Sequence, residues 1–526
     1  MRIKNILLIA FVLPLFITSC DNYLDELPDN RTTVDTKLEI QKLLVSAYPG
    51  SSPAMIAELS SDNIDDQGAT NPYTELLIEE AAYWQDMTVV NQSDDSKAVW
   101  ESAYFAIAHA NQALEAIEEI GDSEDLSAEK GEALITRAYG HFILVNVFCK
   151  HYNETTSGTD LGIPYLEEPE TTLNPQYDRG TVEDVYEKIN DDIEAAIPLI
   201  DDSIYDVPAY HFTTRAANAF AARFNLYYGK WDKAITYANA VLGTSPESLL
   251  RSWSDLGTVT RDITAVTNAY IEDTSNLLTQ AHGSNLGIYF GAYYSGSRMS
   301  HSRKIADEQT LFAPTVFSPD GIIAAANSTE LEYAAFVYTA TNLDKSLHYK
   351  IPYRFEYTDV VAGIGFRRTV LVPFTTDETL LVRAEAYIMS GLNEQAIADI
   401  NLWTNNFYNI PTTVTVDQVD DFYNAMAYSS IDDITQKKEL NPGFDLTTGS
   451  TQENMIHYVL QCRRLLTLHE GLRWYDIKRY GIAVPRYQIQ TNGNFIENSF
   501  LTANDERKAI QIPQDVISAG MTANPR

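Results

Sequence analysis

Cysteine and basic residues are both scarce in this chain of 526 residues. With only 3 cysteines, a scaffold held together by many disulfides is excluded. The 37 Lys and Arg residues are outnumbered by 73 Asp and Glu residues, which gives a formal net charge of −36. Such acidity argues against binding nucleic acid or anionic lipid through a general electrostatic field. Hydrophobic residues make up 45% of the chain, which is typical of a folded protein.

Long apolar runs are missing after the N-terminus, where no segment reaches the roughly 18 apolar residues of a membrane-spanning helix. At the start, Arg2 and Lys4 precede an uncharged stretch at 6–17, the length of a signal-peptide hydrophobic region. It ends in Ile17-Thr18-Ser19-Cys20, which resembles a bacterial lipobox. We therefore expect a lipoprotein signal peptide at 1–19, lipidation of Cys20 and a lipidated tether at 20–35.

Motifs of the common enzyme classes are also absent from the sequence. Neither a His-Glu-x-x-His motif, a Gly-x-Ser-x-Gly motif nor a phosphate loop occurs. We therefore assign no catalytic residue, no metal ligand and no cofactor. Cys149 and Cys462 lie in apolar patterns, and either one disulfide or two separate buried thiols would fit.

Helical periodicity dominates the first half of the chain. Trp100, Tyr104, Ile107, Asn111 and Leu114 recur at intervals of three and four, which predicts one helix face that ends at Gly121. The apolar stretch 133–148 predicts a second helix. A third is expected to begin after Thr181, because acidic residues follow directly and favour a first helical turn.

Two segments, 221–234 and 382–396, share a tighter pattern. Gly229 and Gly391 are each followed by an alanine five residues later and preceded by one seven residues earlier. This resembles the tetratricopeptide repeat, in which two antiparallel helices pack through small residues and turn at glycine. The alternative is an unrelated helical hairpin that happens to turn at glycine.

The region between these segments has a different composition. Residues 243–375 are rich in Gly, Ser, Thr, Asn and aromatic residues and show little periodicity, and 405–455 is a second loop-rich stretch. Long irregular insertions in a helical scaffold often carry binding function. We expect one domain over 36–526, with a helical part at 36–242, a loop-rich insertion at 243–375 and a C-terminal part at 376–526.

Several motifs occur together in a characteristic order. They are Arg137-Ala138-Tyr139, Gly162-Ile163-Pro164, Arg179-Gly180-Thr181, Arg463-Arg464, the run from Glu470 to Gly481, and Ile510 to Gln514. With them, nearly the whole mature chain resembles the SusD/RagB family of nutrient-binding outer-membrane lipoproteins. The chain departs from the family pattern at Cys462 and Leu466, where glutamate is common, which predicts local repacking.

The resemblance implies a mainly α fold of tetratricopeptide-like helix pairs with long loop-rich insertions. It also implies a lipid-anchored protein on the cell-surface face of the outer membrane, with no enzymatic activity. The implied partner is a SusC-like TonB-dependent β-barrel transporter, to which the protein delivers captured oligosaccharides or polysaccharide fragments. An oligopeptide-capturing lid like the RagB branch, or a purely structural adaptor for the barrel, are the alternatives.

The C-terminal motif is interpreted as structural. Glu470, Arg473, Asp476 and Arg479 are spaced by three, so opposite charges are expected to pair along one helix face.

The ligand site is predicted from residue types that recognise sugars. Aromatic rings stack on the apolar faces of sugar rings, and polar side chains bind the hydroxyls. The candidates are Tyr73, Trp84, Tyr289, Tyr293, Tyr294 and Arg298. For Trp84 the alternative is core packing. We expect Trp84→Ala combined with Tyr293→Ala to lower ligand affinity with little change in melting temperature.

Overall fold

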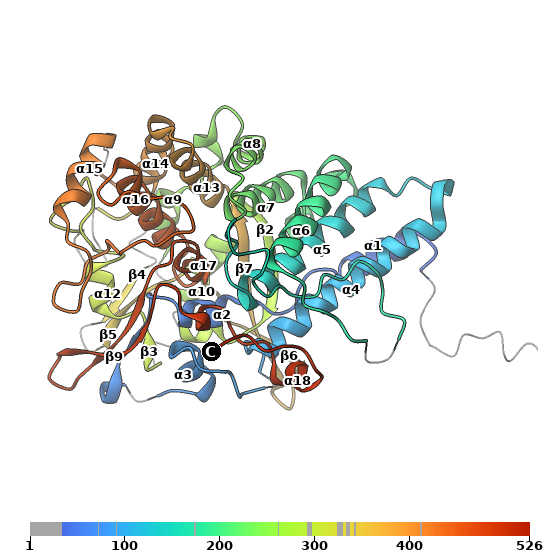
Figure 1. Ribbon diagram of the computed structural model, residues 1–526, viewed down its shortest axis with the longest axis horizontal. Helices are drawn as coiled ribbons and strands as arrows, with labels where there is room; N and C mark the ends of the chain where they lie inside the picture. The colour runs from blue at the N-terminus through green and yellow to red at the C-terminus, as the bar shows by residue number, and fades with distance from the viewer. Residues whose placement is uncertain are drawn as a thin grey trace, which may run out of the picture.

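The structure is a computed structural model. It describes residues 34–526 except 72, 91, 173–174, 261, 292–296, 323–329, 333–336, 341–342 and 411–412. The signal peptide, Cys20 and most of the tether predicted above lie outside the described residues. The described chain is mainly helical, with small sheets lying among the helices (Figure 1). No helix in the described ranges is both long and apolar enough to cross a bilayer.

The N-terminal part consists of paired helices. They are α1 (Lys37–Leu44), α2 (Ala54–Ser60), α3 (Leu76–Ala82), α4 (Ser96–Ile120), α5 (Ser127–Phe148), α6 (Val182–Ala196), α7 (Thr214–Tyr227) and α8 (Trp231–Leu242). The predicted helix over Trp100–Leu114 is confirmed as α4, which ends where Gly121 adopts a φ of 58°. The predicted start after Thr181 is also confirmed, since Thr181 and Asp184 form a reciprocal capping box at α6.

The two glycine-containing segments form the predicted helical hairpins. The second hairpin consists of α13 (Thr376–Met389) and α14 (Asn393–Phe407). Gly229 and Gly391 both turn the chain with a φ of 73°, a conformation that glycine adopts without steric cost. Although the hairpins are far apart in sequence, α13 packs against both α7 and α8 (Figure 1). The insertion therefore leaves and re-enters one continuous helical stack.

The insertion contains more regular structure than its composition predicts. Its elements are α9 (Trp253–Gly257), α10 (Ile263–Ile271), β2 (Asn276–Gly283), α11 (Leu286–Tyr289), β3 (Met299–Ser300), α12 (Arg303–Glu308), β4 (Val337–Ala340), β5 (Leu343–His348), β6 (Arg354–Asp359) and β7 (Ile364–Thr375). Strands β2, β7 and β6 form an antiparallel sheet, and β7 runs directly into α13. This continuity ties the insertion to the helical stack.

The C-terminal part adds α15 (Val416–Ala425), α16 (Thr451–Leu466), α17 (Leu472–Arg479), β8 (Val484–Ile489), β9 (Phe495–Leu501) and α18 (Gln514–Ser518). A second sheet has the strand order β3-β1-β8-β9, where β1 is Asp65–Asp66. It joins the N-terminal segment, the insertion and the C-terminal part. Cys149 and Cys462 are both buried free thiols, so the disulfide alternative is wrong.

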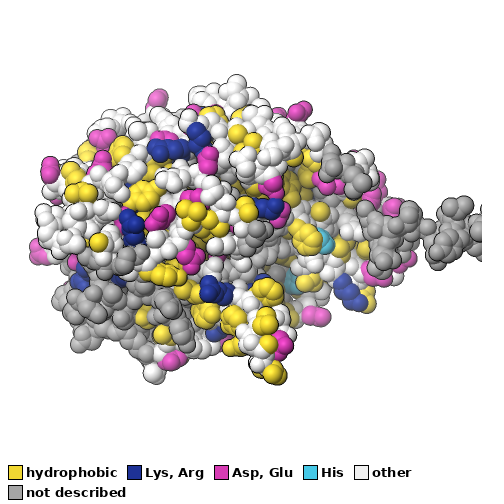
Figure 2. Space-filling view, turned by 90° about the horizontal axis from the view of Figure 1, so that it is seen from below, with side chains coloured by type: hydrophobic (Ala, Val, Ile, Leu, Met, Phe, Trp, Pro, Cys, Tyr) yellow, Lys and Arg dark blue, Asp and Glu magenta, His cyan; other side chains and the backbone are white. Residues whose placement is uncertain are grey.

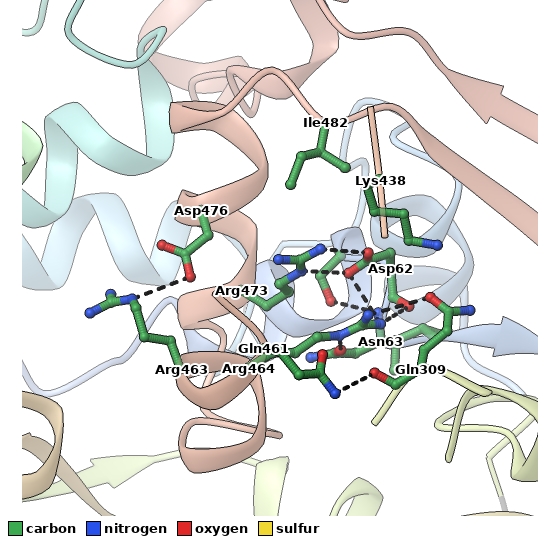
Figure 3. A network of polar contacts seen from close by, with 12 residues as sticks. Asp62, Asn63, Gln309, Lys438, Gln461, Arg463, Arg464, Arg473, Asp476 and Ile482 are labelled. Atoms are coloured by element: carbon green, nitrogen blue, oxygen red, sulfur yellow. Dashed lines mark hydrogen bonds and ion pairs between the residues drawn. The ribbon is translucent and has the colours of Figure 1, made fainter. Parts of the chain in front are cut away.

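Helices α16 and α17 carry a buried ionic network (Figure 3). Arg473 donates to both oxygens of Asp62 at 2.8 and 2.9 Å, and Arg464 donates to the Asn63 side chain at 2.8 Å. Within the predicted helix face, Asp476 pairs with Arg479 at 2.9 Å, whereas Glu470 pairs with Lys350. The structural interpretation is therefore supported, but most of the pairing connects distant segments instead of neighbouring helical turns.

Candidate functional site

Two segments that carried sequence candidates lie side by side next to β1 and β3. The Gln67 amide donates to the Arg298 carbonyl at 2.8 Å, and the Arg298 amide donates to the Tyr73 carbonyl at 2.7 Å. The Asn71 side chain also donates to the Ser297 carbonyl. These bonds hold Gln67, Asn71 and Tyr73, which precede α3, against Ser297 and Arg298. They bring together Tyr73 and Arg298, two of the candidates for the ligand site.

Asp66 is the centre of this cluster. Its two carboxylate oxygens accept hydrogen bonds from Arg298 at 2.6 and 2.7 Å, in the bidentate geometry that matches a guanidinium to a carboxylate. The Tyr83 hydroxyl donates to Asp66 at 2.6 Å and the Gln488 amide at 2.8 Å. Asp66 therefore joins β1, α3, the insertion and β8.

The pKa values in the cluster follow from burial and these partners. Burial alone would raise the pKa of Asp66, but hydrogen bonds from Arg298, Tyr83 and Gln488 outweigh it and hold that pKa below its usual value. Burial, followed by the hydrogen bond to Asp66, raises the pKa of Tyr83 to about 12. At neutral pH these groups offer fixed charges and hydrogen bonds instead of acid–base chemistry.

Glu75 connects two further candidates. The Tyr73 hydroxyl donates to Glu75 at 3.2 Å, and Tyr289 shares a side-chain hydrogen bond with the same carboxylate. The Tyr73 side chain is 52% exposed, whereas Tyr289 is buried against α3 and β3. Burial, followed by the bond to Glu75, raises the pKa of Tyr289. Of the two rings, Tyr73 is thus the one with a large open face.

Trp84 points away from this surface. It has a φ of 53°, is only 5% exposed and donates from its indole nitrogen to the Ser60 carbonyl at 2.8 Å. The Arg486 guanidinium lies 5.1 Å from the ring centre. The indole is therefore part of the core in this structure, and its face is covered and unavailable for stacking on a sugar. The neighbouring Tyr83 reaches the cluster instead.

Tyr293 and Tyr294 lie outside the described residues. The cluster contains polar residues that sequence reasoning did not single out, namely Asp66, Glu75, Glu79, Tyr83, Gln488 and Asn498. Asp66 lies within a polar stretch at 60–74, seven positions before the candidate Tyr73. Gln488 and Asn498 come from strands near the C-terminus, and their approach depends on the β1–β8 pairing.

The surface of the protein mixes residue types. In the view of Figure 2, acidic side chains are scattered among hydrophobic and basic ones and do not form one continuous patch. The strong net negative charge is thus dispersed on this face, which leaves room for local recognition by individual side chains.

Comparisons with known proteins agree with these observations. Residues 22–226 match a family model described as "Starch-binding associating with outer membrane". The chain is 22% identical to the SusD-like protein P38 of Formosa agariphila, over 92% of this chain and 93% of that protein.

Solved structures share the fold. A SusD superfamily protein from Bacteroides thetaiotaomicron has a TM-score of 0.62 at 18% identity, covering 94% of this chain and all of the other. A SusD-like carbohydrate binding protein from Bacteroides vulgatus has a TM-score of 0.60 at 15% identity, covering 91% and 96%. Together with the motif order and the mainly helical fold, these matches support the resemblance to the SusD/RagB family.

Proposed function

We propose that this protein captures oligosaccharides or polysaccharide fragments at the outer membrane and delivers them to a SusC-like TonB-dependent transporter. The observation that carries the ligand part is the cluster around Asp66 and Arg298, with the exposed Tyr73 ring beside it. An open aromatic face next to fixed hydrogen-bonding groups is suited to a sugar ring and its hydroxyls. The family description as starch-binding supports the same ligand class.

Within the cluster, Arg298 is held in a fixed orientation by its carboxylate partners. Arg298 donates from its Nε and one terminal nitrogen to Asp66, and its other terminal nitrogen donates to Glu79 at 3.2 Å. Its orientation is therefore fixed before a ligand binds. Its side chain is still 26% exposed. A preorganised, partly exposed guanidinium can donate to a sugar oxygen without a large ordering cost.

An oligopeptide-capturing lid of the same kind of transporter is the second candidate function. The observation that favours it is the burial of Trp84, Trp100, Trp253, Trp403 and Trp474, which leaves few broad indole faces for sugar stacking. A peptide ligand would use the exposed polar groups of the cluster through its backbone.

A binding screen separates these functions. The lipid-free chain from residue 21 onward is titrated calorimetrically with purified neutral polysaccharides and with peptide pools. We expect a neutral glycan to bind, and Tyr73→Ala combined with Arg298→Ala to abolish that binding. Tyr210→Ala with Arg303→Ala is the matched control, because Tyr210 is 57% exposed and Arg303 pairs with Asp307 within α12 and not with Asp66. Binding of peptides alone would overturn the glycan proposal.

Lipid anchoring and the transporter partner complete the proposal. Residues 17–20 resemble a lipobox, so Cys20→Ser is expected to prevent acylation and to release the protein from the membrane fraction. Extraction of membranes in mild detergent, followed by affinity purification, is expected to recover a TonB-dependent barrel together with this protein. Recovery of the protein alone would contradict the partnership.

A further inference from the structure

A large cavity lies apart from the Asp66 cluster, where the helical stack meets the C-terminal part. Its volume is about 720 Å³, within the size range of ligand pockets. It is lined by the loop after α5, the turn between α7 and α8, the end of α17, and the loops at 441–444 and 503–508. Five separate stretches of the chain thus enclose one space.

Aromatic side chains form part of its wall. Tyr152, Tyr228, Trp231 and Phe444 all line the cavity and all are partly exposed. The rings of Tyr152 and Tyr228 lie 4.7 Å apart at 82°, and those of Trp231 and Phe444 lie 6.3 Å apart at 80°. Since the other five tryptophans are buried, Trp231 is the one indole in the protein that is partly open to solvent.

Two buried lysines also line the cavity, and their environment is unusual in so acidic a protein. Lys478 donates to the carbonyls of Asn146 and Cys149 at 2.5 and 2.6 Å, and Lys508 donates to those of Ile482 and Ala503 at 2.7 and 2.5 Å. Among the described residues, neither ammonium has a carboxylate within ion-pair distance. Each retains one N–H, because an ammonium has three donors.

A buried ammonium without a counter-charge is costly. Burial lowers the pKa of Lys478 to about 7 and that of Lys508 to about 7. Asp505 is the one carboxylate whose charge acts on Lys508 in the described structure, and it is already paired with Arg507, while no carboxylate acts on Lys478. A bound anion would supply the missing charge.

Three of the acidic residues on the cavity wall are already paired with basic side chains. Lys150 pairs with both Asp160 and Glu506, at 3.3 and 2.9 Å, and Asp505 pairs with Arg507 at 2.8 Å. One oxygen of Asp160 and one of Glu506 remain without a hydrogen-bond donor in the described structure.

The Tyr227 hydroxyl is likewise buried without a partner among the described residues, and it belongs to the same wall. The cavity therefore offers open aromatic rings, acceptors and a phenol for hydroxyl groups, and two ammonium groups for an anion.

We infer that this cavity is a second binding site, which takes an acidic sugar unit carrying a carboxylate or a sulfate ester. The anionic group accepts hydrogen bonds from Lys478 and Lys508, the sugar hydroxyls contact Tyr227, Asp160 and Glu506, and an aromatic ring covers the sugar face. This inference is independent of whether the Asp66 cluster binds a glycan.

Trp231 provides the first test. The lipid-free protein is titrated with trigalacturonate, with a 6-sulfated galactobiose and with neutral maltotriose while tryptophan fluorescence and its quenching by acrylamide are recorded. We expect at least one of the two acidic saccharides to saturate the signal and protect Trp231, and their relative affinities identify the carboxylate or the sulfate as the preferred anion. Equal binding of maltotriose, or no saturation by any of the three, would overturn the inference.

Variants locate the binding by calorimetry. Lys508→Met and Tyr228→Ala are expected to weaken binding of the acidic saccharide by about tenfold or more, because a charge-assisted contact or a stacking face is removed. Lys437→Met is the matched control, since Lys437 is another buried lysine that donates to a backbone carbonyl but lies outside the cavity lining. Thermal melts identify any variant that fails to fold. Loss of acidic-sugar binding in Arg298→Ala, with Lys508→Met unaffected, would place that binding in the Asp66 cluster and overturn the second site.

Discussion

Asp62 and Asp66 lie four residues apart in the segment that follows α2, and each carboxylate accepts two hydrogen bonds from one arginine. Arg473 binds Asp62 at 2.8 and 2.9 Å, and Arg298 binds Asp66 at 2.6 and 2.7 Å. The two pairs differ in burial, since the Arg473 side chain is 4% exposed and that of Arg298 is 26% exposed. The same chemistry therefore stabilises the fold at one position and presents a polar group to a ligand at the other.

The surroundings of the two pairs reinforce this difference. Asp62 also contacts Arg464 at 3.4 Å, so two buried guanidinium groups depend on one carboxylate (Figure 3). Around Asp66, by contrast, Tyr83, Gln488 and Glu79 form a rim in which Arg298 stays accessible. Because its charges are buried, the Asp62 network should lose stability when one of its residues is substituted. The partly exposed Asp66 cluster should tolerate substitution with little loss of stability.

The largest expected effect comes from Asp62→Ala. Removing this carboxylate leaves Arg464 and Arg473 buried without their counter-charge, which costs about 3–5 kcal/mol of unfolding free energy. Urea unfolding followed by circular dichroism measures the loss. Asp307→Ala is the control, because it removes a surface carboxylate paired with Arg303 and should change stability by less than about 1 kcal/mol. Equal stability of the two variants would contradict the stabilising role assigned to the buried Asp62 carboxylate.

Trp84→Ala comes next and tests two adjacent residues that face opposite ways. Truncating the buried indole leaves a cavity and an unpaired Ser60 carbonyl, so we expect a loss of about 3 kcal/mol. Tyr83→Phe removes only one hydroxyl from the partly exposed cluster and should cost about 1 kcal/mol. The order of melting temperatures checks this. A Trp84→Ala protein that melts like the wild type would restore Trp84 as a ligand candidate.

These two residues also show how far sequence reasoning reached. Helical periodicity and glycine turns were enough to predict α4, α6 and both hairpins, because those signals are local. Which of Tyr83 and Trp84 faces inward depends on a backbone φ of 53° at Trp84, which no periodic pattern encodes. Strands β1 and β3 have two residues each, too few for an alternating pattern to predict.

Pairing between distant segments was the harder part. Spacing along α17 predicted that Arg473 would pair within its own helix, yet its partner is Asp62. Likewise, Gln488 reaches Asp66 only through the β1–β8 pairing. Both contacts join residues more than 400 positions apart, so they depend on tertiary packing, for which a single sequence offers no local signal.

An identical substitution at both arginines compares the pairs directly. Lysine keeps the charge but loses the planar, bidentate geometry. Arg473→Lys is expected to lower the unfolding free energy by about 2 kcal/mol, since a buried oxygen of Asp62 loses its donor. Arg298→Lys should leave stability within about 1 kcal/mol and weaken glycan binding by about fivefold. Calorimetric titration and urea unfolding of both variants provide the test, and a reversed pattern would contradict the assigned roles.

Acid titration offers a smaller effect with a definite sign. Burial raises the pKa of Asp62, but Arg464 and Arg473 outweigh it and hold that pKa far below 3.8. The stabilisation is therefore present above the unfolded-state pKa near 3.8 and is lost as pH falls below it. The stability difference between the wild type and Asp62→Asn should be constant from pH 7 to about 4 and about 1 kcal/mol smaller at pH 3. A difference that stays unchanged down to pH 3 would rule out this strong depression.

The smallest change expected is that of Tyr73→Phe, and it separates the ring from its hydroxyl. The hydroxyl donates to Glu75 at 3.2 Å on an exposed surface, so its removal should alter stability by less than about 0.5 kcal/mol. If the ring face is what contacts the sugar, affinity should stay within about twofold in Tyr73→Phe and fall by about tenfold in Tyr73→Ala. Equal losses in both variants would instead assign the contact to the hydroxyl and its Glu75 partner. The Asp66 cluster would then bind its ligand by hydrogen bonding alone, as a peptide-binding surface does. Stacking on Tyr73 would have no part in recognition.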